Sequence, residues 1–179
     1  MELLNPTIAF DALRDFLAAG GNVLVIIMFT TFFMWALIIE RLFYWSSAHA
    51  GVAKRAQRAW DARSDHNSWA AHAVRDRLIS EAMQEAARFN NVIKVLVAVT
   101  PLLGLLGTVT GMVEVFDVMA VTGSSNARLM AAGISKATIP TMAGLVASLS
   151  GLIFINTFER NVMKASHAVS DSLLVGGAK

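Results

Sequence analysis

The residues of this chain that are best suited to do chemistry are threonines inside apolar segments. Residues 100–113 are apolar enough to lie in lipid, yet they contain Thr108 and the three glycines Gly104, Gly107 and Gly111. Small residues at such spacing let a membrane helix pack closely against other helices. A hydroxyl inside a membrane helix is a candidate pore-lining group, and Thr108 is therefore the first candidate site residue.

The sequence does not indicate other kinds of site. The chain has no cysteine, which excludes disulfides, thiolate metal sites and a cysteine nucleophile. The spacing of His49, His66 and His72 would not place three metal ligands together, so we expect surface histidines and no metal. No nucleotide-binding loop, acyl-transfer triad or pair of catalytic carboxylates is recognisable. We expect neither an enzyme nor a cofactor, and the net charge of +2 gives no reason to expect nucleic acid as a partner.

The composition is that of a membrane protein. The 179 residues are 55% hydrophobic, with a mean hydropathy of +0.55, which is more apolar than soluble domains of this length. Three apolar segments, 23–39, 92–113 and 137–156, are each close to the roughly 20 residues that cross a bilayer. We expect an all-α membrane protein with three transmembrane helices. The alternative is a large water-soluble core, and its main support is that the first segment has only 17 residues.

The distribution of basic residues predicts the orientation. The segment before the first apolar stretch has one arginine, Arg14, against three acidic residues, whereas nine basic residues lie in the region from Arg41 to Lys94. Basic residues are retained on the cytoplasmic side, so the N-terminus is expected outside and the C-terminus inside. The nine basic residues are Arg41, Lys54, Arg55, Arg58, Arg63, Arg75, Arg77, Arg88 and Lys94.

Residues 1–21 are expected to form an amphipathic helix on the external membrane surface. Asn5-Pro6 is typical of a helix start, and Gly20-Gly21 is typical of a helix end. A disordered tail is the alternative. The segment lacks the basic and continuous apolar regions of a cleavable signal peptide, so we expect none.

The first transmembrane helix is expected over residues 22–45. Its apolar residues include no small-residue face for close packing, so we expect it to face lipid. Residues 43–45, Phe-Tyr-Trp, lie beside Arg41 and are typical of an aromatic belt at the cytoplasmic interface.

Residues 46–90 are polar and are expected to form a cytoplasmic helical region with a turn at 64–67. From Ser68 the helical pattern continues without a break into the second transmembrane helix, residues 91–118. The sequence therefore predicts one helix of about 50 residues, bent at Pro101.

An external loop is expected over 119–132, a third transmembrane helix over 133–157 and a cytoplasmic helix and tail over 158–179. Small residues recur along one face of the third helix at steps of three and four, which permits tight, nearly parallel packing along the helix. They are Gly133, Ala137, Thr141, Gly144, Ser148 and Gly151.

Two segments carry a resemblance to a known family. Residues 101–112, PLLGLLGTVTGM, and residues 133–148, GISKATIPTMAGLVAS, resemble the second-span and third-span signatures of the ExbB/TolQ/MotA proton-channel family. The chain looks most like a compact ExbB. The resemblance implies a ring of identical subunits, similar to a pentamer, in the inner membrane of Gram-negative bacteria, with the external side as the periplasm.

The resemblance also implies partners. A small ExbD-like single-span protein would lie inside the ring, with an aspartate that carries the proton, and a TonB-like protein would be energised to drive outer-membrane transport such as iron–siderophore uptake. Membrane lipid is the remaining expected partner. A TolQ-like subunit that drives envelope maintenance shares the same core motifs and is the alternative. A non-conducting membrane scaffold is an alternative of another class.

The resemblance carries two residues over cleanly. Thr108 matches the second-span threonine and Thr141 the third-span threonine, and in the family both face the central pore near the partner's aspartate. A proton that moves to a buried carboxylate needs polar groups or ordered water along its path, and hydroxyls supply both donor and acceptor. The alternative is that each hydroxyl bonds only to a carbonyl of its own helix.

The chain departs from the family at two positions. Lys136 stands where family members commonly have glutamate, which puts the role of that glutamate in the ion path in doubt here. Thr110 stands where tryptophan is frequent. Helix geometry places Glu114 and Lys136 at similar depth and pointing away from the pore, so we hypothesise an interhelical ion pair between them. The alternative is that each charge reaches the outer interface independently.

Overall fold

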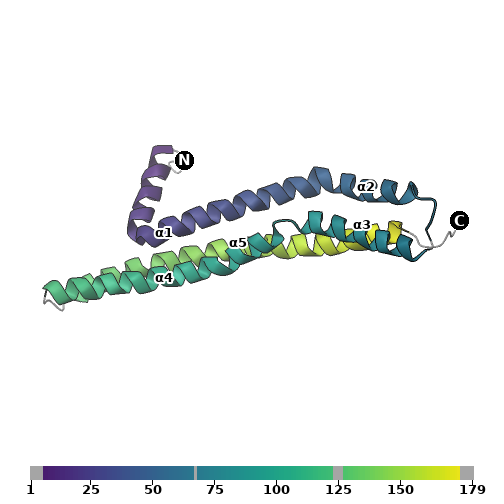
Figure 1. The fold of residues 1–179 in the computed structure, drawn as a ribbon. Coiled ribbons are helices and arrows are strands. Elements are labelled where there is room, and N and C mark those ends of the chain that lie inside the picture. Colours follow the sequence, from purple (N-terminus) through teal and green to yellow (C-terminus); the bar gives the residue numbers. More distant parts are fainter. Residues whose placement is uncertain (1–5, 67, 123–126, 174–179) are drawn as a thin grey trace. The chain divides into compact units, whose positions relative to one another are not determined.

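The computed structural model describes residues 6–66, 68–122 and 127–173, and within these ranges the protein is helical apart from two short connections. The elements are α1 (Pro6–Phe43), a π-helix η2 (Tyr44–Ala48), α2 (His49–Asp61), α3 (Trp69–Ala87), α4 (Asn90–Thr122) and α5 (Ala127–Ser172) (Figure 1). Three helical stretches are long and apolar enough to cross a membrane. They lie within Gly20–Ser46, Trp69–Val121 and Met130–Ser172, of which the second comprises α3 and nearly all of α4. The chain is therefore a multi-pass membrane protein, as its composition predicts.

The helix α1 is kinked at Gly21. This residue has φ of 65° and ψ of −164°, a backbone conformation that costs little only for glycine. The helix begins at Pro6, and Figure 1 shows its N-terminal part turning sharply away from the rest. The kink coincides with the predicted end of the amphipathic segment, and the chain continues directly into the first apolar stretch.

The prediction of a single long helix from Ser68 onward is wrong. The helix α3 ends at Ala87, and α4 begins at Asn90. Arg88 adopts φ −52° and ψ 136°, and Phe89 has φ of +66°, in the left-handed region. Because the usual left-handed residues after a helix are glycine and asparagine, Arg-Phe gives no signal of an end. Pro101 and Pro140, by contrast, lie inside α4 and α5 without ending them.

The predicted external loop over 119–132 is also too long. The helix α4 continues to Thr122 and α5 already starts at Ala127, so helix occupies both flanks of the expected loop. Residues 123–126 lie outside the described residues.

The contacts divide the chain into two compact units, and α1, α4 and α5 each contribute to both. One unit comprises residues 1–35 and 95–151. In it, one face of α1 is buried, with Leu24, Ile27 and Met34 at 2% exposure or less, while Phe29, Phe32 and Phe33 are exposed. One face of this apolar helix therefore packs inside the unit, and the exposed phenylalanines are suited to contact with lipid.

The other unit comprises residues 36–94 and 152–179. Its core joins α2, α3 and the end of α5 through Ala56, Trp60, Ala71, Val169 and Leu173. At the start of α3, the Ser68 hydroxyl accepts a hydrogen bond from the Ala71 amide at 3.2 Å, which caps the helix.

Candidate ion-path site

The helices α4 and α5 approach each other closely at the glycines that the sequence singles out. A Cβ on Gly104 would lie 3.0 Å from Thr141 Cα, and one on Gly144 would lie 2.8 Å from the carbonyl oxygen of Thr100. A Cβ on Gly111 would lie 2.7 Å from Ala137 Cβ. Figure 1 shows the two helices side by side over this region. The absence of side chains at these positions is what allows the two backbones to come together.

The other small residues of the α5 stripe extend this contact. Gly133 lies against Val115 of α4. At Gly151, a Cβ would meet Val97 Cγ2 at 2.6 Å and Met34 Sδ at 2.7 Å. On α4, a Cβ at Gly107 would lie 2.5 Å from Pro140 Cβ. The stripe thus faces α4, and at its Gly151 end it also meets α1.

The close approach brings together Thr108 and Thr141, the two predicted site residues. Their hydroxyl groups form a hydrogen bond to each other across the helices. Thr141 Oγ1 also donates to the Gly104 carbonyl oxygen at 2.8 Å, and Thr108 Oγ1 lies 3.5 Å from the same oxygen. Three oxygens therefore converge at one half-buried point. The alternative that each hydroxyl bonds only to its own helix does not describe Thr141, because the hydrogen bond of Thr141 crosses to α4.

A second interhelical bond repeats the first one heptad further along. Ser148 Oγ donates to the Val97 carbonyl oxygen at 2.8 Å. Ser148 lies seven residues after Thr141, and Val97 lies seven residues before Gly104, as antiparallel helices require. Thr100 is fully buried between these two bonds and donates to Leu96 of its own helix at 2.6 Å. The sequence suggested Ser148 only as a packing residue and gave no role to Thr100.

The site offers hydroxyls and carbonyls but no ionisable group. Neither residues 95–113 of α4 nor residues 137–158 of α5 include an Asp, Glu, Lys, Arg or His. Hydroxyls can donate and accept without holding a charge that would trap an ion. The arrangement can therefore relay a proton but needs a titratable carrier from elsewhere. The role of the two threonines in an ion path stays a prediction.

Glu114 and Lys136 do not form the hypothesised ion pair within this chain. Among the residues that the structure describes, four ion pairs have charged atoms within 4.0 Å, and none joins these two side chains. Both side chains are exposed, and both line one cavity of about 450 Å³. The similar depth in the membrane that helix geometry predicts for them stays a prediction.

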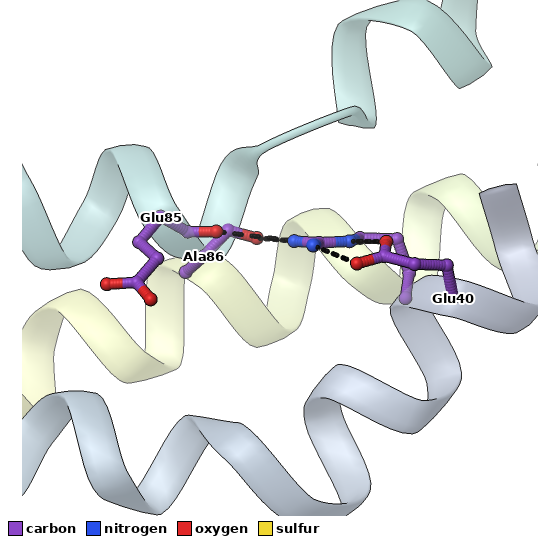
Figure 2. A network of polar contacts seen from close by, with 4 residues as sticks. Glu40, Glu85 and Ala86 are labelled. Atoms are coloured by element: carbon purple, nitrogen blue, oxygen red, sulfur yellow. Dashed lines mark hydrogen bonds and ion pairs between the residues drawn. The ribbon is translucent and has the colours of Figure 1, made fainter.

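Sequence reasoning missed the site at Arg41. This side chain was expected at the membrane interface, yet it is only 2% exposed. Its guanidinium donates to the carbonyl oxygens of Glu85 at 3.3 Å and Ala86 at 3.4 Å, in the last turn of α3. Glu40 accepts from the same group at 2.6 and 2.8 Å. Figure 2 shows Glu40 on one side of the guanidinium and the two carbonyl groups on the other.

Aromatic rings complete the surroundings of Arg41. Its guanidinium carbon lies 4.5 Å from the centre of the Tyr44 ring and 5.5 Å from that of Phe89. Such cation–π contacts stabilise a desolvated guanidinium. The only hint in the sequence is Arg41 with aromatic neighbours, a pattern equally typical of an interfacial belt.

The described residues contain no cluster of three or more metal-ligating side chains. His66 bonds through Nε2 to the Trp60 carbonyl oxygen at 3.1 Å, and its ring lies edge-on to the Trp60 ring.

Comparison with known proteins points to one group of transporters. An ExbB-like biopolymer transport protein of Synechocystis is 40% identical over 74 residues, which cover 40% of this chain and 35% of that protein. The biopolymer transport protein ExbB of Pseudomonas putida is 30% identical over 97 residues, covering 54% of this chain and 30% of the relative. ExbB of Salmonella typhimurium is 31% identical over 87 residues, covering 49% and 36% respectively. The matches span about a third of the length of these relatives.

A family model extends the likeness beyond these local matches. The model of the MotA/TolQ/ExbB proton channel family matches residues 45–171, which include α2, α3, α4 and nearly all of α5. The match covers well over half of the chain, and the chain belongs to the MotA/TolQ/ExbB proton channel family.

Proposed function

We propose that this chain is an ExbB-like stator and channel subunit of a bacterial inner membrane. With an ExbD-like partner it uses the proton-motive force to energise a TonB-like protein and so drives outer-membrane transport, for example of iron–siderophore complexes. The observation that carries the proposal is the pairing of the Thr108 and Thr141 hydroxyls at the Gly104 carbonyl oxygen. In this proposal the chain is not an enzyme.

The need for a partner follows from the missing ionisable group. The spans of α4 and α5 around the threonine pair offer only hydroxyls and carbonyls. A proton crossing a low-dielectric region requires a group that can bind and release it, and an aspartate on a partner helix supplies one. The threonine hydroxyls would then orient that carboxylate through hydrogen bonds.

The exposed faces of unit 1 support a ring of identical subunits, similar to a pentamer. The small-residue stripe of α5 lies in the contact with α4. Large apolar side chains on both helices remain exposed, as expected for contact with lipid or with further copies of the chain. Those on α4 include Leu102, Leu105 and Val109, and those on α5 include Met142, Val146 and Leu149. The distribution of basic residues supports a periplasmic N-terminus and a cytoplasmic C-terminus.

The test is native mass spectrometry of the detergent-purified chain, alone and co-expressed with a single-span, aspartate-bearing ExbD-like protein. A closed homo-oligomer that retains a smaller number of partner chains is expected. Proton flux in liposomes should then fall in Thr108→Ala and Thr141→Ala. A monomer that ignores the partner, or full flux in both variants, would favour the scaffold. Stable capture of a TolR-like protein in preference to the ExbD-like one would favour the TolQ-like role.

A further inference from the structure

A cavity of about 450 Å³ lies beside the kink of α1. Its walls come from residues 20–23 at the kink and from the outer parts of α4 and α5. The polar side chains in the lining are Asn22, Thr110, Glu114 and Lys136, and the remaining walls are mostly apolar. Sites for small molecules have this character: a largely apolar surface of roughly 300–1,000 Å³ with a few polar groups.

The two charges in this cavity have opposite sign and do not meet. Within the described part of the chain, neither Glu114 nor Lys136 takes part in an ion pair. Charged side chains next to membrane-spanning residues are stabilised by a partner of opposite sign or by water. A carboxylate and an ammonium group held apart in one cavity therefore suit a ligand that carries both charges itself.

We propose that this cavity binds the phosphoethanolamine headgroup of a zwitterionic membrane phospholipid. The primary ammonium of the headgroup pairs with Glu114, and its phosphate pairs with Lys136. The Asn22 side-chain amide offers a further donor for phosphate oxygens. The apolar walls accept the glycerol backbone and the first carbons of the acyl chains. The proposal goes beyond the channel function, although it rests on the proposed position of this end of α4 and α5 at the membrane surface.

Charge complementarity separates this ligand from other headgroups. An anionic phosphatidylglycerol satisfies Lys136 but leaves Glu114 facing negative charge. The quaternary ammonium of phosphocholine has no N–H group, so it cannot donate a hydrogen bond to Glu114. Charge-assisted hydrogen bonds are the stronger kind, so the primary ammonium is the better match.

The experiment is native mass spectrometry of the full chain with phosphatidylethanolamine, phosphatidylglycerol and phosphatidylcholine added separately to the detergent. We expect phosphatidylethanolamine to be retained about tenfold more tightly than the other two, since a charge-assisted hydrogen bond contributes about that factor. Glu114→Gln should remove the preference over phosphatidylglycerol. Lys136→Met should weaken retention of all three lipids, because each carries a phosphate.

Two further variants guard against misfolding and non-specific effects. Asp117→Asn removes a carboxylate three residues further along α4 that does not line the cavity, and it should leave retention unchanged. Thr110→Trp fills the cavity without changing its charge, so the specifically retained lipid should be lost while the mass of the protein assembly stays the same.

Equal retention of all three lipids, or an unchanged preference in Glu114→Gln, would overturn the proposal. The charge-exchanged double variant, Glu114→Lys with Lys136→Glu, gives a second test. The proposal would also be overturned if each of these single substitutions abolishes the assembly, the double variant restores it, and no lipid is retained. That result would mean that Glu114 and Lys136 pair between copies of the chain. The same spectra test the ring separately, because a monomer that still selects phosphatidylethanolamine would contradict the ring and not the lipid site.

Discussion

The Arg41 guanidinium donates a hydrogen bond to the Ala86 carbonyl oxygen, 45 residues further along the chain, at 3.4 Å. The contact joins the end of α1 to the last turn of α3, where the Glu85 carbonyl oxygen also accepts from the Arg88 backbone amide at 3.4 Å. A cation at a helix C-terminus also interacts favourably with the helix dipole. Arg41 thus stabilises the end of α3, immediately before Arg88 and Phe89 turn the chain into α4.

Replacing Arg41 should loosen this junction. Arg41→Met removes the Arg41 hydrogen bond to the Ala86 carbonyl and leaves the Glu85 carbonyl with only the Arg88 amide, which should cost about 1–3 kcal/mol of stability. Hydrogen exchange should accelerate at residues 86–90. The matched control is Arg77→Met, which breaks a solvent-exposed pair with Glu81 and should have little effect on stability. Equal effects of the two substitutions would contradict a special role for Arg41.

The threonine pair can be separated from simple helix packing by comparison with Ser148. Thr141→Val keeps the shape but removes the bonds to Gly104 and Thr108, and we expect proton flux to be lost in complexes reconstituted with the ExbD-like partner. Ser148→Ala removes an equivalent interhelical bond, worth on average about 0.6 kcal/mol in membranes, and should leave flux largely intact. Thr141→Ser should restore flux. If Ser148→Ala abolishes flux as completely as Thr141→Val, the threonine hydroxyl has no distinct role.

Gly144 should tolerate no side chain. In Gly144→Ala the new methyl group would lie 2.8 Å from the Thr100 carbonyl oxygen, so α4 and α5 must separate, at a cost of about 1–3 kcal/mol. Thermal unfolding in detergent and the yield of intact oligomer should both fall. Gly51 of α2 is the matched control, since a Cβ added there would meet no side chain or other element within 4 Å. Gly51→Ala should instead stabilise the protein by about 0.5–1 kcal/mol.

Arg75 should stabilise the end of α5. Its guanidinium donates to the Leu173 carbonyl oxygen at 2.7 Å and to that of Ser170 at 2.8 Å. Arg75→Met should raise hydrogen exchange at residues 169–173 and lower stability by about 1 kcal/mol. An unchanged exchange rate there, with the protein otherwise folded, would show that the core side chain of Leu173 is sufficient to hold this end.

The sequence was most informative where one physical constraint dominated. Apolar length predicts the three long apolar helices. The left-handed conformation at Gly21 lies where Gly20-Gly21 predicts the end of the N-terminal amphipathic helix. The spacing of small residues predicts which face of α5 can approach α4, and Gly104, Gly111 and Gly144 lie in that contact. These features depend on local pattern alone.

What the sequence did not reveal depends on long-range contacts. Phe89 takes a conformation that its residue type disfavours, and its ring lies near the guanidinium groups of Arg41 and Arg88. Arg41 is buried because carbonyls from a distant helix satisfy it. Helix geometry predicts a similar depth for Glu114 and Lys136, but it gives no sign of the cavity that both side chains line. In each case the deciding partner comes from another element.

The paired bonds of Thr141 and Ser148 to α4 also determine how this part of the protein can move. The two bonds lie on the same faces of the two helices, seven residues apart. Sliding α5 by one turn would therefore break both bonds, and it would push side chains against Gly104 and Gly144. Residues 97–104 of α4 and 141–148 of α5 therefore behave as one stiff pair of helices. In the proposed ring, motion coupled to ion flow would therefore take place between subunits or at the partner, and not as sliding of α5 along α4.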